Sequence, residues 1–119
     1  MTPGATTFAA VRRLARTIPG VEDGTSWGTP SLKVNGRMLA CMAIHRSAEP
    51  RSLIVVMPVA ERDELIVNAP DVFYLTPHYE PHATVLVRLE RIHPDALRDL
   101  LAAGARRLAA KPKARARKT

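Results

Sequence analysis

Apolar residues near the start of the chain recur at the spacing of a helix. Over residues 7–18 they fall on one stripe, while three arginines lie on the remaining surface. The hydroxyl of Thr6 or Thr7 can cap the first turn, and Pro19-Gly20 ends the pattern. The spacing therefore predicts an amphipathic helix over 7–18. Residues 21–30 are rich in Gly, Thr and Ser, which predicts a structured loop.

Apolar segments separated by turn signals follow this loop. Residues 32–34 and 38–44 flank Asn35-Gly36, the pair that most readily adopts the positive φ angles of a two-residue hairpin turn. Residues 52–57 are almost wholly apolar, which is typical of a central strand covered on both faces. The three segments predict three successive strands.

The second half of the chain predicts a helix, two strands and a final helix. Pro58 can open the first helix because a proline needs no N–H partner there, and the helix ends before Pro70. Residues 72–75 and 84–90 have the pattern of strands, and Pro94 opens the last helix. Runs of strands broken by helices favour an α+β fold: a two-layer, antiparallel five-stranded sheet with helices mainly on one face.

Length and composition favour one domain in a reducing compartment. A chain of 119 residues can bury roughly two-thirds of its unfolded surface around one core. The longest apolar run, residues 53–57, is too short to cross a bilayer, and residues 1–10 lack the pattern of a secretory signal. Cys41 is the only cysteine, which excludes an internal disulfide and indicates an inert core thiol. We expect a cytoplasmic protein with no membrane segment.

The net charge of +7 comes from the end of the chain. Residues 106–119 hold seven basic residues and no acidic one, so residues 1–105 hold eleven of each. Residues 109–119 offer no bulky apolar surface to bury, which predicts a disordered basic tail after a domain over residues 1–108. Such a tail can contact polyanions or simply keep the protein soluble. Its basic residues are Lys111, Lys113, Arg115, Arg117 and Lys118.

Four segments of the chain resemble the MmcQ/YjbR-like family. They are GTSWGTPSLKV at 24–34 followed by Gly36-Arg37, ERDEL at 61–65, FYLTPHY at 73–79 and VLVRL at 85–89. With the spacing between them, the resemblance runs from about Phe8 to Leu108. It implies a compact α+β fold of the secretion-chaperone-like type, in agreement with the predicted order of elements.

The resemblance also implies DNA binding, since one branch of the family is labelled DNA-binding on the strength of a double-wing surface. The chain departs from the family pattern at Gly104-Ala105, where many relatives carry an Ala-Trp pair. Its basic tail lies outside the shared domain.

Three cations of the body are candidates for a nucleic-acid surface built from strands: Lys33, Arg37 and Arg88. Phosphate binding needs several such charges on one face, because each released counterion adds to affinity. Together with the basic residues of the tail they form the predicted nucleic-acid-binding set. The alternative is a solvated face on which Arg88 pairs with Glu90 or Glu80.

A candidate pocket lies between two loops that carry Ser26, Trp27, His78 and Tyr79. Exposed aromatic rings beside cations can stack on a base or another ligand. The alternative is that Phe73 packs in the core and Tyr79 fixes its loop through the hydroxyl. Ser26 and His78 could also serve hydrolysis, but no Gly-x-Ser-x-Gly turn accompanies them.

A metal site finds little support in the sequence. His78 and His82 have the i, i+4 spacing of metal ligands on a helix, but Pro77 and Pro81 argue against a helix there. No other histidine or cysteine has recognisable ligand spacing. We expect neither a metal nor a cofactor.

These observations favour a non-enzymatic DNA-binding protein. In this hypothesis the hairpin from Lys33 to Arg37 positions the domain on DNA, and the tail adds affinity without sequence preference. The alternative is a domain that binds a small ligand or a protein partner without catalysis. The sequence leaves the oligomeric state open.

Overall fold

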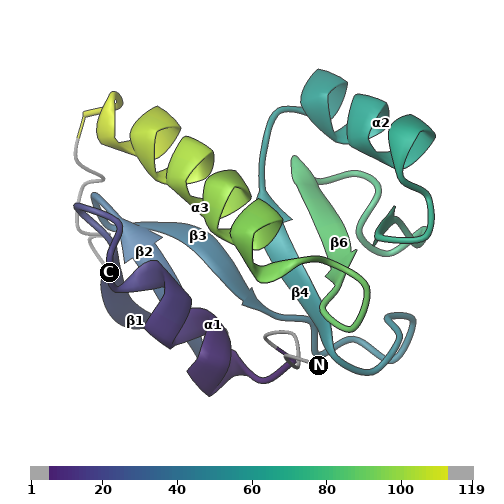
Figure 1. Ribbon diagram of the computed structural model, residues 1–119, viewed down its shortest axis with the longest axis horizontal. Coiled ribbons are helices and arrows are strands. Elements are labelled where there is room, and N and C mark those ends of the chain that lie inside the picture. Colours follow the sequence, from purple (N-terminus) through teal and green to yellow (C-terminus); the bar gives the residue numbers. More distant parts are fainter. Residues whose placement is uncertain (1–5, 113–119) are drawn as a thin grey trace.

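The computed structural model describes residues 6–112 (Figure 1). Over this range the chain forms helices and strands in the order α1-β1-β2-β3-β4-α2-β5-β6-α3. Their bounds are α1 Phe8–Ala15, β1 Glu22–Ser26, β2 Thr29–Val34, β3 Arg37–Met42, β4 Ser52–Val56, α2 Val59–Asn68, β5 Phe73–Tyr74, β6 Thr84–Arg88 and α3 Pro94–Ala109.

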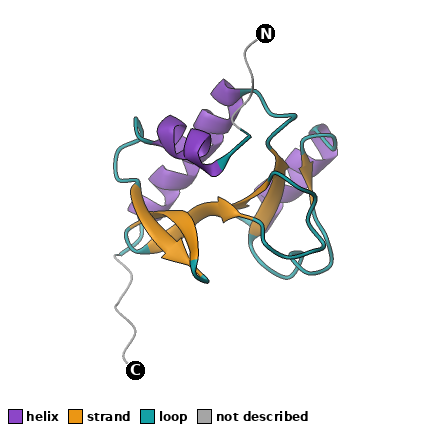
Figure 2. Ribbon diagram, turned by 90° about the horizontal axis from the view of Figure 1, so that it is seen from below, coloured by secondary structure: helices purple, strands orange, loops and turns teal. Residues whose placement is uncertain are grey.

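The strands form one antiparallel sheet in the order β1-β2-β3-β4-β6-β5. The helices lie on one side of this sheet, and loops lie against part of the other side (Figure 2). Helix α3 packs on β2, β3 and β4, α1 packs on α3, and α2 packs on β5 and β6. The predicted two-layer α+β architecture is therefore confirmed.

The main core lies between the sheet and the helices. It consists mainly of aliphatic side chains, and α3 contributes Leu97, Leu101 and Leu108 while the sheet contributes residues such as Leu39 and Val85. Burial of this apolar surface is the main favourable term in folding. Gly104 faces the sheet within this layer, where an added Cβ would lie 2.7 Å from Leu39 Cδ1. The absence of a side chain at Gly104 thus allows a close approach of α3 to the sheet.

A helix cap and a turn form at the residues that the sequence predicted. The hydroxyl of Thr7 accepts a hydrogen bond from the Ala10 amide and caps α1, although the helix ends at Ala15, earlier than predicted. Asn35 and Gly36 adopt φ angles of 54° and 75° in the turn between β2 and β3, as a two-residue hairpin turn requires.

The prediction of five strands was wrong by one, because residues 21–30 are not a loop. Residues Glu22–Ser26 form β1, which pairs with β2 through a turn at Trp27-Gly28. Both turn residues have positive φ, 53° and 74°. Strand β1 lies at the edge of the sheet and is mostly exposed, so its sequence carries no alternation of apolar and polar residues that would have marked a strand.

The sheet face without helices, here called the open face, carries a second apolar cluster. Cys41, Ile54 and Leu86 face each other across β3, β4 and β6 and are buried there. Their cover comes from the loop between β5 and β6, whose Tyr79 is 7% exposed. Arg62 of α2, 5% exposed, donates hydrogen bonds to backbone carbonyls of that loop and so holds it in place.

Candidate functional site

Two of the predicted cations lie at one end of the sheet, beside the turn between β2 and β3. The Asn35 side-chain amide donates to the carbonyls of Leu108, Ala109 and Lys111, so the turn is bound to the end of α3. Arg37 Nη2 donates to the Pro112 carbonyl at 3.3 Å. The last described residues, Lys111 and Pro112, therefore lie beside this turn.

Lys33 lies in β2 just before this turn but on the other face of the sheet from Arg37, since Lys33 pairs with Met38 of the open-face cluster and Arg37 with Val34 of the main core. The aliphatic stem of Lys33 crosses β1 at Gly24, where an added Cβ would lie 2.9 Å from Lys33 Cδ, and so leads away from the turn. We call Lys33, Arg37 and Lys111 the basic end. Four other predicted residues of the tail, Lys113, Arg115, Arg117 and Lys118, lie outside the described residues, as does most of the predicted disordered segment.

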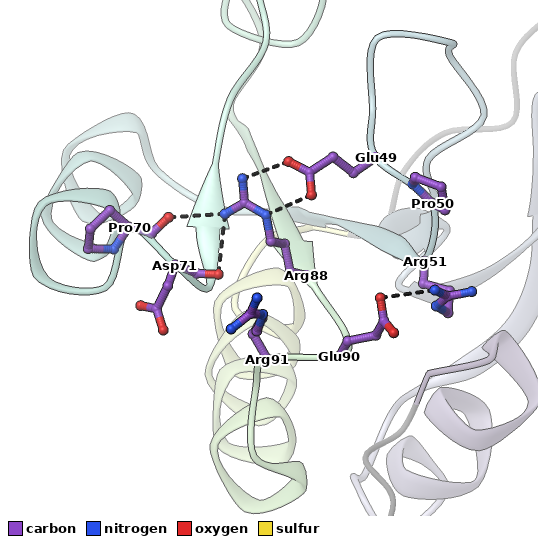
Figure 3. Close-up of a pocket in the computed structure, with 8 residues that line it drawn as sticks. All are labelled: Glu49, Pro50, Arg51, Pro70, Asp71, Arg88, Glu90 and Arg91. Carbon is purple, nitrogen blue, oxygen red and sulfur yellow. Dashed lines mark hydrogen bonds and ion pairs between the residues drawn. The ribbon is translucent and has the colours of Figure 1, made fainter.

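Arg88, the third predicted cation of the body, is bound to neighbouring groups (Figure 3). Its guanidinium forms two hydrogen bonds with the Glu49 carboxylate, at 2.7 and 2.9 Å, and donates to the carbonyls of Pro70 and Asp71. It also stacks on the Tyr74 ring at 4.1 Å. The hydrogen bond to Arg88 lowers the pKa of Glu49, and the same bond raises the pKa of Arg88.

The structure does not bring Arg88 together with the basic end. Arg88 pairs with Ser52, at the start of β4, whereas Arg37 starts β3 at the turn with β2. Since β3 and β4 run antiparallel with Met42 opposite Leu53, Arg88 lies at the opposite end of the sheet. Its carboxylate partner is also neither of the two expected from sequence, because Glu90 pairs with Arg51 instead.

The polar cavity around Arg88 has a volume of about 460 Å³ and balanced charge. Its ionic side chains are three carboxylates and three guanidinium groups, of which two pairs are already closed by hydrogen bonds. Arg91 and Asp71 are the remaining two (Figure 3). A cavity with this balance has no excess of positive charge for an anionic ligand.

A second cavity opens on the open face, between the turn that carries Trp27 and the loop that carries His78. Its volume is about 490 Å³, within the range typical of small-molecule sites. We call it the open-face pocket; its lining residues are Trp27, Thr29, Cys41, Met42, Ile44, His45, Ile54, His78, Tyr79, His82 and Thr84. Three of the four residues predicted to mark a pocket therefore line one.

The fourth residue predicted for the pocket, Ser26, is not among its lining residues. Its hydroxyl donates to the hydroxyl of Ser31 at 3.1 Å, on the neighbouring strand. The pairing with His78 that hydrolysis would need is therefore not formed. Cys41 lies in the floor of the pocket, where burial raises the pKa of its thiol to about 11 and so disfavours the reactive thiolate.

One wall of the open-face pocket is held by a network of rings and hydrogen bonds. The rings of His45 and His78 stack with centroids 3.5 Å apart and planes within 5°. Tyr79 packs edge-on against both, and its hydroxyl accepts a hydrogen bond from the His45 amide. Ser47 links the two loops, since its hydroxyl bonds to both His45 Nδ1 and Thr76 Oγ1 at 2.8 Å. Tyr79 thus fixes its loop, as the alternative interpretation of this residue expected.

Sequence reasoning missed eight of the eleven lining residues, among them Ile44 and His45. Both lie in the connection after β3, and no spacing in the sequence relates them to His78. The exposure of Ile44, 63%, is a surface signal that only a structure provides.

Metal coordination does not explain the three histidines around this pocket. Within residues 6–112, no group of three or more His, Cys, Asp or Glu side chains is placed to hold a metal ion. Over the same residues, no helix is long and apolar enough to span a membrane.

Comparison with known proteins identifies a family. Residues 16–104 of the 119 match the family model described as YjbR. The chain matches no curated protein and no solved structure. The matched range begins at the end of α1 and covers the sheet, α2 and most of α3.

Proposed function

The chain belongs to the YjbR family, and we propose that it is a non-enzymatic cytoplasmic protein that binds duplex DNA through its basic end. The observation that carries this proposal is the junction of turn and tail. Asn35 and Arg37 hold Lys111 and Pro112 beside the turn, which lies between Lys33 and Arg37 in the chain.

The ion pairs of the domain also favour this end of the molecule as the DNA-binding site. Five arginines of the described residues form ion pairs with carboxylates: Arg12 with Asp23, Arg51 with Glu90, Arg62 with Asp63, Arg88 with Glu49 and Arg107 with Glu61. Phosphate binding draws on cations that can exchange counterions for phosphates. None of these ion pairs involves Lys33, Arg37 or Lys111, the residues of the basic end.

The expected contacts are with the DNA backbone. A lysine or arginine on a phosphate positions a protein without reading sequence. About four to six such contacts would give a slope near −4 to −5 when log affinity is plotted against log salt concentration. Affinity should therefore be similar for duplexes of different sequence.

The test is fluorescence anisotropy of a labelled duplex over a series of salt concentrations. We expect Lys33→Ala with Arg37→Ala to weaken binding, and deletion of residues 111–119 to flatten the slope to about −2. Arg13→Ala with Arg91→Ala is the matched control, because it removes the same charge from exposed sites elsewhere. Equal loss in the control would mean that net charge alone drives binding. If the truncated body does not bind at low salt, the domain is not a DNA-binding domain.

A further inference from the structure

Trp27 occupies a backbone conformation that suits tryptophan poorly. Its φ of 53° and the 74° of Gly28 are those of a two-residue hairpin turn that Asn-Gly fills best. A bulky residue with positive φ is uncommon, since its Cβ crowds the backbone. The side chain is also 75% exposed, so the fold gains little burial from it. The only tryptophan of the chain thus costs stability where it lies, at the edge of the open-face pocket.

The residues that line this pocket disfavour a charged ligand. Its eleven residues include no Asp, Glu, Lys or Arg. The floor is apolar, formed by Cys41 and Ile54 of the sheet, and the exposed side chain of Ile44 adds to the rim. A charged ligand would lose hydration here without finding an opposite charge. A phosphate or carboxylate group therefore fits the basic end and not this pocket.

The histidine pair gives the pocket a flat, fixed wall. The Ser47 amide donates to His45 Nδ1, so the neutral ring carries its proton on Nε2. Partial desolvation, together with the neighbouring His78 and Arg46, lowers the pKa of His45, which keeps this ring uncharged at pH 7. Trp27, the histidine pair and Tyr79 thus place four rings around one cavity.

We propose that the open-face pocket binds a small, uncharged, planar aromatic molecule that stacks on Trp27, at a site separate from the basic end. Planar rings gain most from stacking on an exposed aromatic face, and the cavity of about 490 Å³ has room for a two-ring molecule. The site is a hollow bordered by one turn and two loops, which suits a small molecule better than the face of a second copy.

The test uses three probes of the same ring size: 2-naphthol, its saturated and non-planar analogue decahydro-2-naphthol, and the anion 2-naphthoate. Binding to the full chain is followed by NMR, through the methyl signals of Ile44 and Ile54. We expect saturable binding of 2-naphthol with a dissociation constant of about 1 mM or lower. The two other probes should bind at least about tenfold more weakly.

Two variants separate a ligand-binding role of Trp27 from a structural one. Trp27→Asn creates the favoured turn pair, so it should keep or raise the melting temperature while it weakens 2-naphthol binding at least about tenfold. Val67→Asn is the matched control, since Val67 is 79% exposed on α2, outside the pocket, and its loss should leave binding unchanged.

Other results would overturn the proposal. They are absence of saturable shifts, equal binding of all three probes, unfolding of Trp27→Asn, and a concentration-dependent dimer that Trp27→Asn dissolves. The last result would make this face an interface between copies. Failure of DNA binding would leave the proposal intact, because Lys33→Ala with Arg37→Ala should not change the affinity for 2-naphthol.

Discussion

Replacement of Arg62 by methionine should destabilise the protein more than any other single loss of an ion pair in the described structure. The guanidinium lies buried beneath the loop between β5 and β6, with the residue only 5% exposed. Its Nη1 donates to the carbonyls of His82 at 2.8 Å and Glu80 at 3.2 Å, while Nε bonds to Asp63. Arg62→Met keeps the aliphatic stem but leaves these carbonyls without their donor.

The size of the effect follows from the hydrogen bonds that are lost. Each bond from a charged donor contributes about 1.5–3 kcal/mol, and a displaced loop can recover part of this by hydration. We therefore expect Arg62→Met to lower the free energy of unfolding by about 3 kcal/mol. Arg51→Met is the matched control: its bond to Glu90 joins side chains that are 52% and 54% exposed, and such pairs contribute below about 1 kcal/mol.

Urea denaturation followed by far-UV circular dichroism measures both variants. Fluorescence is a poor probe here, because Trp27 is already exposed in the folded protein. The midpoint should fall much further for Arg62→Met than for Arg51→Met, at similar denaturant dependence. Equal loss of stability in the two variants would refute the claim that Arg62 holds the loop.

Two further predictions concern α3 and the cavity around Arg88. Gly104→Ala should lower the free energy of unfolding by about 1 kcal/mol, because the new Cβ would meet Leu39 Cδ1 at 2.7 Å. This loss should exceed the gain from the better helix propensity of alanine. An increase in the urea midpoint would contradict the prediction. Glu49→Gln should destabilise the protein more at pH 7 than near pH 3. The pKa of Glu49 is lowered in the folded state, so its stabilisation is present above the unfolded pKa of about 4.3 and is lost as pH falls through the folded value. Urea midpoints of both forms at the two pH values test this, and a constant difference would contradict it.

Much of the fold could be predicted because its signals are local. Asn35-Gly36 marks its turn by residue type alone, and Thr7 caps α1 through a contact three residues away. Strand β1 was missed since an exposed edge strand has no buried face to impose a pattern. Its turn was missed as well, because tryptophan is not a residue that signals positive φ.

The candidate sites were predictable only where their residues lie in a few neighbouring loops. Trp27, His78 and Tyr79 were grouped correctly, since a turn and a loop next to strands tend to meet at one side of a sheet. Arg88 was expected either on a phosphate-binding surface or paired with Glu90 or Glu80, but its partner is Glu49, which lies 39 residues away and comes near only through the register of β4 and β6. Contacts of this kind depend on how the strands pair, which residue types do not encode locally.

The open-face pocket has a physical origin in the way this sheet is covered. In a two-layer fold the face without helices is normally polar, yet Cys41, Ile54 and Leu86 form an apolar row there. This row must be covered, and only loops are available to cover it, since the helices lie on the other side (Figure 2). The loop between β5 and β6 covers part of the row, held by Arg62 from one side and by the Tyr79 hydroxyl from the other. The part of the row that the loop does not cover is an apolar cavity bordered by aromatic rings. The hydrogen bonds that hold the loop also fix the walls of this cavity.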